Sequence, residues 1–220
     1  MAHLHIPDGV LPLALWLSGW VLAAAALLAS TLRKATPQQM AFRSAIGALA
    51  LAAMAVELPL GPFEYHLTLA GPVGVLLGVA GGYQVLFIAT SMLAFLGHGG
   101  FTVIGLNALV LGSGAMAARM AFVVARRRVS APAAMAVATA IGQATAGLLW
   151  LALVGFAVRA GSAVGAQRLP TLAVFALPLW ALGIGLETLV AFGIARFLAR
   201  VRPDVLPATA PVRRPEVETA

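Results

Sequence analysis

Long apolar runs make up most of this chain, and clusters of Arg, Pro or Gly separate them. The first run, 10–32, holds no charged residue and ends at Arg33-Lys34. Six further runs follow, at about 41–58, 67–80, 83–96, 102–125, 133–158 and 171–197. A bilayer core is crossed by about 20 apolar residues in a helix, so the pattern predicts an all-α, polytopic bundle of about seven transmembrane helices. The third and fourth runs are unusually short, and Gly81-Gly82 divides them.

The basic residues predict the orientation of this bundle. In the seven-helix arrangement, eleven of the 14 Lys and Arg residues fall on one side, Arg159 and Arg168 fall on the other, and Arg119 lies within a span. Lys and Arg are enriched in cytoplasmic loops, which predicts an outer amino terminus, a cytoplasmic carboxyl terminus and a multi-pass protein of the inner (cytoplasmic) membrane. Topology thus accounts for the net charge of +7, and no nucleic-acid partner is expected.

Composition supports a single membrane domain. Hydrophobic residues make up 61% of the chain, charged residues 10%, and mean hydropathy is +0.98, well outside the globular range. One transmembrane domain is expected over 1–200. The Pro- and Ala-rich segment 201–220 is expected to be a disordered cytoplasmic tail.

Two absences exclude classes of chemistry. The chain has no Cys, which removes thiolate metal sites and cysteine nucleophiles. Its single lysine, Lys34, follows no Gly-rich loop, so an ATP-hydrolysing P-loop is excluded. The protein is therefore not expected to be an ATPase, and energy for any transport must come from a partner or a gradient.

All four histidines, His3, His5, His66 and His98, fall on the outer side of the predicted topology. Imidazole is the commonest protein ligand for first-row divalent metals. If Met1 is retained, the terminal amine, two amide nitrogens and the His3 imidazole form a planar four-nitrogen chelate. If Met1 is removed, the Ala2 amine with the His3 amide and imidazole supplies three nitrogens and leaves one position for a second imidazole. Planar nitrogen ligands favour Ni²⁺ or Cu²⁺ over Zn²⁺. The domain over 1–200 is therefore expected to bind a metal, with 1–9 as its chelating segment.

Four further polar residues are candidates for supporting roles. Asp8 lies in a Pro-Asp-Gly turn that could fold the amino terminus back into the bundle. Glu64 could orient an imidazole, and Asn107 could face the same pocket as His98. Glu187 lies within the last apolar run, where an ionisable residue marks either function, such as coupling, or an ion pair, here with Arg119.

Several segments of this chain resemble a known family. They are His5-Ile6-Pro7-Asp8-Gly9-Val10-Leu11-Pro12, His66 with Gly71-Pro72 and Gly78, Gly97-His98-Gly99-Gly100-Phe101-Thr102 with Gly105 and Asn107, Glu187-Thr188, Phe197-Leu198 and Arg202-Pro203-Asp204. Together they resemble the cobalt/nickel substrate-specific components of energy-coupling-factor (ECF) ABC transporters, the CbiM/NikM family. The opening motif combined with Gly-His-Gly-Gly is the specific part of the resemblance.

The resemblance implies a membrane bundle that takes up Ni²⁺ or Co²⁺ as transported substrate, with an ECF transmembrane coupling protein and ATPase subunits as partners. It implies that the terminal amine, the amide and imidazole of the second residue and His66 hold the metal, with His98 in support. Relatives begin Met-His, whereas three residues separate Met1 from His5 here. If Met1 is removed, His3 could take the chelating role, and His5 would become a spare ligand or a support.

Two other functions remain open from the sequence. One is an intramembrane metalloenzyme that uses the histidines and Glu187, although no His-Glu-x-x-His motif is present. The other is a metal-independent channel or assembly protein, for which the histidines would be dispensable.

Overall fold

The computed structural model describes residues 6, 8–32, 34–56, 58–60, 63–159 and 169–207, with backbone alone at 59, 60, 63, 64 and 169–176. In these residues six α-helices, one short hairpin and one 3₁₀ turn follow each other along the chain. Their bounds are α1 Leu13–Thr31, α2 Pro37–Ala55, β1 Leu58–Leu60, β2 Phe63–Tyr65, α3 Ala70–Phe95, α4 Ile104–Ala125, α5 Ala131–Arg159, α6 Leu169–Val201 and η1 Pro203–Val205.

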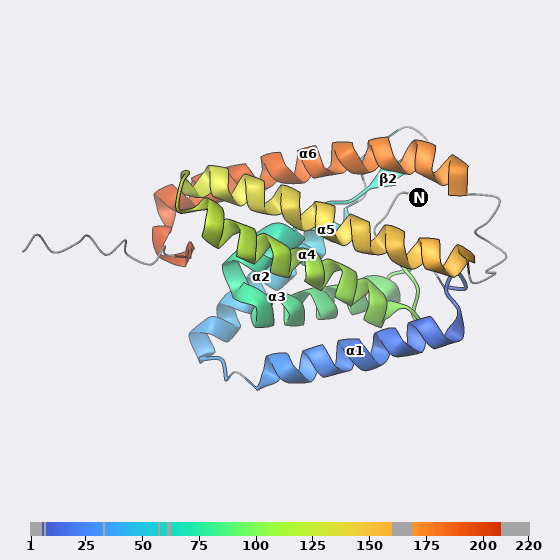
Figure 1. The fold of residues 1–220 in the computed structure, drawn as a ribbon. Coiled ribbons are helices and arrows are strands. Elements are labelled where there is room, and N and C mark those ends of the chain that lie inside the picture. The colour runs from blue at the N-terminus through green and yellow to red at the C-terminus, as the bar shows by residue number, and fades with distance from the viewer. Residues whose placement is uncertain are drawn as a thin grey trace, which may run out of the picture.

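The helices form an elongated bundle in which most run along one direction (Figure 1). Five of the described helices are long and apolar enough to cross a membrane: α1, α3, α4, α5 and the 177–201 part of α6. The predicted all-α membrane architecture is confirmed. The count of seven crossings and the orientation of the two ends stay predictions.

Helix α3 is broken at Gly78 and folds back on itself. Gly78 has φ 70° and ψ −179°, a conformation that is essentially restricted to glycine. A Cβ atom on Gly82 would lie 3.2 Å from the Cα atom of Gly74, although eight residues of continuous helix span about 12 Å. The helix therefore consists of two antiparallel arms, 70–77 and 79–95, which match the two short apolar runs in the sequence.

The break lies at Gly78 rather than at Gly81-Gly82, where the sequence placed it. Gly81 and Gly82 are helical, and they are needed for close approach instead. A Cβ atom on Gly81 would lie 2.8 Å from Nε of Arg43, and Gly82 faces the first arm. Without side chains, both positions let neighbouring segments pack tightly.

The first arm of α3 packs inside the bundle against α4 and α5. Gly74 faces the backbone of Ala115 in α4, and a Cβ atom there would lie 2.6 Å from the Ala115 Cα atom. On the other side, a Cβ atom on Gly71 would lie 2.9 Å from the Thr139 Cα atom in α5. Small residues at such crossings allow the close helix packing typical of membrane bundles.

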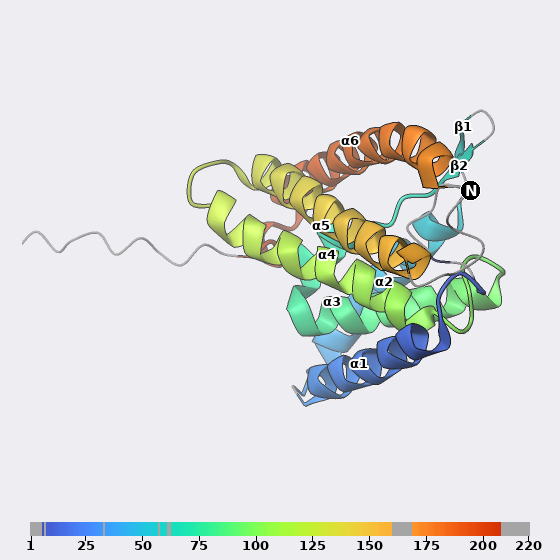
Figure 2. The ribbon, with the colours of Figure 1, turned by 45° about the vertical axis from the view of Figure 1, so that its right-hand side comes forward.

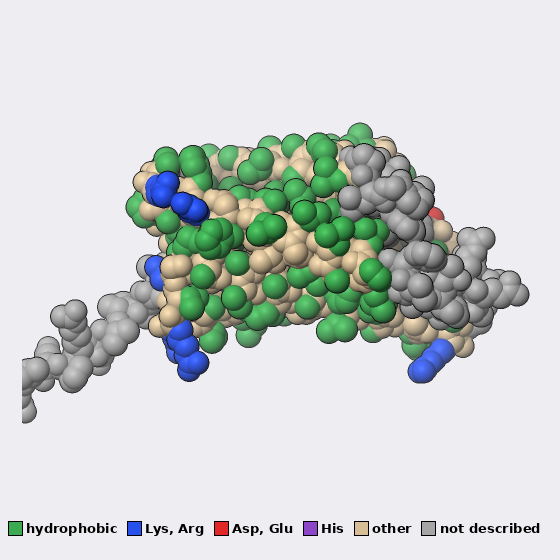
Figure 3. All heavy atoms as spheres, turned by 90° about the horizontal axis from the view of Figure 1, so that it is seen from above, with side chains coloured by type: hydrophobic (Ala, Val, Ile, Leu, Met, Phe, Trp, Pro, Cys, Tyr) green, Lys and Arg blue, Asp and Glu red, His purple; other side chains and the backbone are tan. Residues whose placement is uncertain are grey.

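Basic side chains gather at one end of the bundle (Figure 3). The carboxyl ends of α1, α4 and α6 lie at this end (Figure 1). Lys34 follows α1, Arg126-Arg127-Arg128 follow α4, and Arg200 lies in the last turn of α6. Arg159, at the end of α5, lies at the opposite end. The described basic residues are thus distributed unequally between the two ends of the bundle.

The first residues of the predicted tail are folded against the bundle. Residues Pro203–Val205 form a 3₁₀ turn, and Arg202 pairs with Asp204 at 2.8 Å. Leu206 packs on the core cluster that includes Phe122. The prediction of disorder for the rest of the tail, 208–220, lies outside the described residues.

Candidate functional site

Asn107, in the first turn of α4, holds the amino-terminal segment in the bundle. This name refers to Ile6 and residues 8–12, the described residues that precede α1. The Asn107 side-chain oxygen accepts a hydrogen bond from the Ile6 amide at 2.8 Å, and its side-chain nitrogen donates to the Ile6 carbonyl at 3.1 Å. Both residues are buried, with Asn107 1% and Ile6 0% exposed. One side chain thus satisfies both backbone groups of Ile6, much as a neighbouring strand would.

Asp8 ties the same segment to the loop between α3 and α4. Its carboxylate accepts hydrogen bonds from the amides of Phe101 at 2.9 Å and Thr102 at 2.8 Å, and from the Thr102 hydroxyl. Partial burial by itself would raise the pKa of Asp8, but these hydrogen bonds from Thr102 and Phe101 hold it below its usual value. The Gly100 amide also donates to the Ile6 carbonyl, at 3.2 Å.

Glycines give the loop that carries His98 its shape. Gly97 has φ 87° and lies two residues after Phe95, the last residue of α3. Its amide donates to the Ala94 carbonyl at 3.1 Å, and the His98 amide donates to the Leu93 carbonyl at 2.9 Å, which is the Schellman pattern of helix termination. A Cβ atom on Gly100 would lie 2.5 Å from the Asp8 nitrogen. The Gly-His-Gly-Gly motif therefore ends a helix and leaves room for the amino-terminal segment.

An apolar cluster buries the inner side of this segment. Ile6 and Leu11 pack with Val103 and Leu106 of the α4 region and with Ala157 of α5. Burial of such side chains from water contributes roughly 1.5–3 kcal/mol each. The amino-terminal segment is therefore attached by apolar contacts as well as by Asn107 and Asp8.

His66 follows β2 and leads into α3. It is 2% exposed. The hairpin that precedes it and the loop that carries His98 lie at the same end of the bundle (Figures 1 and 2). This is the end opposite the basic cluster, and the amino-terminal segment is docked there.

Glu187 of α6 fixes the backbone just after His66. Its carboxylate accepts hydrogen bonds from the Thr68 amide, from the Thr68 hydroxyl at 2.8 Å and from the Leu69 amide at 3.1 Å. Gln143 of α5 donates to the Thr68 hydroxyl oxygen at 2.6 Å. Leu69, the residue before the first arm, has a left-handed conformation with φ 51°. The carboxylate thus binds amides at the start of the arm that have no acceptor within the helix.

Arg119 binds the other end of that arm rather than Glu187. Its guanidinium donates to the Val75 carbonyl at 2.7 Å. An anion at a helix amino end and a cation at its carboxyl end both interact favourably with the helix dipole. The two ionisable residues that the sequence offered as an ion pair thus bind opposite ends of one short helical arm.

The structure brings together only part of the predicted site. Through Ile6, it joins Asp8 and Asn107 to the loop of His98. The predicted ligands Ala2, His3 and His5 lie outside the described residues, and so does the side chain of Glu64. Among the described residues, no group of three or more His, Asp or Glu could hold a metal ion.

Two residues of this region were not singled out from the sequence. Thr68 and Gln143 are 2% and 3% exposed and connect Glu187 to α5. Gln143 carried a usable signal, since an amide side chain within an apolar run of helical length must find a hydrogen-bond partner. Thr68 carried none, because threonine is common in any segment.

Comparisons with known proteins agree with this architecture. Residues 5–205 match the CbiM family, described as the cobalt uptake substrate-specific transmembrane region. A candidate metal transport protein of Haemophilus influenzae is 31% identical over 119 residues, which cover 54% of this chain and 57% of the relative. The match thus spans little more than half the length of that relative.

Two solved structures share the fold. One, a transition metal transporter, superimposes with a TM-score of 0.72 at 16% identity and covers 90% of this chain and 93% of its own. The other, a truncated transition metal transporter, gives 0.71 at 16% identity, with 89% and 98% covered. At this identity they support the fold alone, whereas the family match extends over nearly the whole sequence. The chain belongs to the CbiM family, and its long apolar helices make it a multi-pass membrane protein.

Proposed function

We propose that this protein is the substrate-binding component of an ECF-type ABC transporter and captures Ni²⁺ or Co²⁺ at the outer face for uptake. The observation that carries this proposal is the docking of Ile6 on Asn107, at 2.8 and 3.1 Å. Ile6 is docked at the end of the bundle that also holds His66 and His98, so a chelate formed by the residues before Ile6 would lie near both histidines. A binding segment held in place loses less freedom when it closes around its ligand.

The proposed ligands are the Ala2 amine and the nitrogens of His3, His5 and His66. Five residues extend over at most about 18 Å, so the terminal amine stays within reach of the end of the bundle where Ile6 is docked. Asp8, Glu64, His98 and Asn107 would position the ligands without binding the metal themselves. A planar set of nitrogens suits Ni²⁺ well, and the family description names cobalt.

The transport arrangement rests on the bundle and its charges. We assign the two arms of α3 as two short crossings, which gives seven crossings with the amino terminus outside and the carboxyl terminus in the cytoplasm. The basic end of the bundle supports this orientation. The ECF coupling protein and ATPase subunits would supply the energy. Glu187 would transmit movement, because it joins α6 to the segment that carries His66.

Equilibrium metal binding by the purified protein tests this proposal. The protein, with its native amino terminus, is titrated calorimetrically with Ni²⁺, Co²⁺ and Zn²⁺, alongside His66→Ala and His98→Ala. We expect one tight site for Ni²⁺ or Co²⁺. Saturable binding should disappear in His66→Ala, whereas His98→Ala should lose about 10- to 100-fold in affinity, as expected for a supporting residue.

Two further experiments test the role of the terminal amine. An added residue before the native terminus should weaken binding sharply, and titrations in buffers of different ionisation enthalpy should reveal proton release, since coordinating nitrogens must lose their protons. Binding indifferent to His66, or no saturable binding, would refute the capture role. Unchanged metal affinity after this extension of the amino terminus would refute only the terminal chelate and not the capture role.

A further inference from the structure

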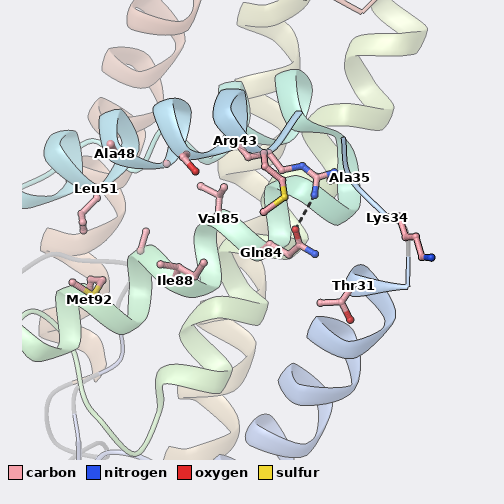
Figure 4. Close-up of a pocket in the computed structure, with 14 residues that line it drawn as sticks. Thr31, Lys34, Ala35, Arg43, Ala48, Leu51, Gln84, Val85, Ile88 and Met92 are labelled. Carbon is pink, nitrogen blue, oxygen red and sulfur yellow. Dashed lines mark hydrogen bonds between the residues drawn. The ribbon is translucent and has the colours of Figure 1, made fainter. Parts of the chain in front are cut away.

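A groove lies between α1, α2 and the second arm of α3 (Figure 4). Its volume is about 570 Å³, within the range of small-molecule sites. It begins at the basic end of the bundle, where Thr31 is the last residue of α1 and Lys34 lies three residues beyond it. From there it continues between α2 and α3 to Leu51 and Met92. Neither His66 nor any described residue before α1 is among the residues that line this groove.

The mouth of the groove is positively charged. Lys34 and Arg43 line it, and the Arg43 guanidinium donates to the Gln84 side-chain oxygen at 3.0 Å. This hydrogen bond orients Arg43 at the mouth, while Gly81 leaves room for its side chain. Among the described residues, those that line the groove include no Asp or Glu, so none of them places a carboxylate opposite these two positive charges.

The rest of the groove is apolar. Leu51 lies eight residues beyond Arg43 on α2, and Met92 lies eight residues beyond Gln84 on α3. At the helical rise, each of these distances is about 12 Å. Between them, Val85 and Ile88 line the wall. The cavity therefore combines a cationic mouth with an apolar channel along the bundle axis.

We propose that this groove binds an anionic phospholipid, with the phosphate between Lys34 and Arg43 and one acyl chain along α2 and α3 toward Leu51 and Met92. The chemistry matches at both ends, because a phosphate accepts hydrogen bonds from ammonium and guanidinium groups. Basic pockets between transmembrane helices at the cytoplasmic side are suited to anionic headgroups. A helix of a partner protein would fill the apolar part but would leave both cations without an anion.

Native mass spectrometry of the full chain tests the site. The protein is transferred from nanodiscs of phosphatidylglycerol, phosphatidylcholine or an equal mixture, and retained lipids are counted and identified. The wild type should retain about one phosphatidylglycerol in preference to phosphatidylcholine. Lys34→Gln and Arg43→Gln should each lower its affinity about fivefold, the effect expected for one basic residue near the headgroup.

Matched variants separate the groove from basic charge in general. Arg127→Gln removes a charge from the same end of the bundle but outside the groove, and it should leave lipid retention unchanged. Ala48→Phe keeps every charge and fills the groove, and it should abolish the preference. Melting temperature and Ni²⁺ binding should stay as in the wild type for Lys34→Gln and Ala48→Phe, which shows that both variants are folded.

Four results would overturn the proposal. One is equal retention of the two lipids by the wild type. Another is a loss of phosphatidylglycerol affinity in Arg127→Gln that is as large as the loss in Lys34→Gln. The third is full displacement of the lipid by inorganic phosphate, which would show that the mouth binds an anion without using the acyl channel. The fourth is a co-purified protein that native mass spectrometry finds in place of the lipid and that Ala48→Phe displaces. That result would assign the groove to a partner protein.

Discussion

The carboxylate of Glu187 accepts a hydrogen bond from the Thr68 hydroxyl at 2.8 Å, which joins the last helix of the bundle to the segment that carries His66. The same carboxylate also binds the Thr68 and Leu69 amides. Since Glu187 is fully buried, these hydrogen bonds replace the solvation that the side chain loses. The contact thus links α6, the start of α3 and the position of His66.

Glu187→Ala should destabilise the protein. It removes the acceptor for two backbone amides and leaves them buried, a loss of about 3 kcal/mol in the free energy of unfolding. Glu187→Gln retains one acceptor oxygen and should lose less. Thermal unfolding in detergent, followed by circular dichroism, measures both.

Asp204→Ala is the matched control for Glu187. Asp204 is an acidic residue paired with Arg202 at 2.8 Å, but both side chains are exposed. Exposed ion pairs contribute little, so this variant should melt as the wild type does. A Glu187→Ala protein that melts at the wild-type temperature would show that the buried carboxylate does not stabilise the start of α3.

Asn107→Ala should release the amino-terminal segment. It removes two buried hydrogen bonds to Ile6, with a cost of about 2 kcal/mol. Asn107→Asp retains the acceptor for the Ile6 amide but loses the donor to its carbonyl, so it should release the segment as well. Hydrogen exchange of the Ile6 amide reports the release directly. If the terminal chelate is correct, Ni²⁺ affinity should fall about 10- to 100-fold.

Gln84→Ala serves as the comparison for Asn107. Gln84 is also an amide side chain on a helix, but its partner is Arg43, far along the chain from Ile6. Exchange at Ile6 and Ni²⁺ affinity should both stay unchanged. Equal protection of Ile6 in Asn107→Ala and in the wild type would mean that apolar contacts alone hold the segment.

Low pH should loosen the same segment through Asp8. Hydrogen bonds from Thr102 and Phe101 depress the pKa of Asp8 below its ordinary value of 3.8. A carboxylate with a depressed pKa stabilises the folded state above the unfolded pKa, and this contribution is lost as pH falls through the folded pKa. The hydrogen bonds by which Asp8 attaches the amino-terminal segment to the loop between α3 and α4 should therefore hold at neutral pH. They should weaken only below about pH 4. Asp8→Asn should remove this pH dependence.

Much of the architecture follows from hydrophobicity. The apolar runs at 10–32, 102–125 and 133–158 correspond closely to α1, α4 and α5, since long uncharged stretches leave a helix as the main way to satisfy the backbone in lipid. The β1–β2 hairpin could not be predicted, because its three-residue strands carry no periodicity. Glycine spacing indicated a break within 67–96 but not which glycine takes the unusual conformation.

The site was predictable only where side chains carry the signal. Asp8 was identified from its Pro-Asp-Gly turn, and Asn107 because a polar side chain within an apolar run needs a hydrogen-bond partner. The partner of Asn107, Ile6, was not identified, since it contributes its backbone, and every residue has one. The role of Glu187 likewise depends on Thr68 and Leu69 amides that lie 119 and 118 residues away in the sequence, a contact that follows from the fold rather than from any motif.

Gly78→Ala should destabilise the fold at the turn between the arms of α3. Space is not the obstacle, because a Cβ atom there would meet nothing within 4 Å. The obstacle is the backbone, whose φ of 70° and ψ of −179° cost a residue with a Cβ atom about 1–3 kcal/mol. The melting temperature should fall accordingly.

Gly155→Ala in α5 is the control for Gly78, since it too has open space around it but lies in regular helix. There alanine should be neutral or slightly stabilising. The contrast isolates the backbone, because both variants add the same methyl group to an uncrowded position. If both melted alike, the two arms of α3 would not depend on the Gly78 conformation, and a continuous helix over 70–95 would have to be considered.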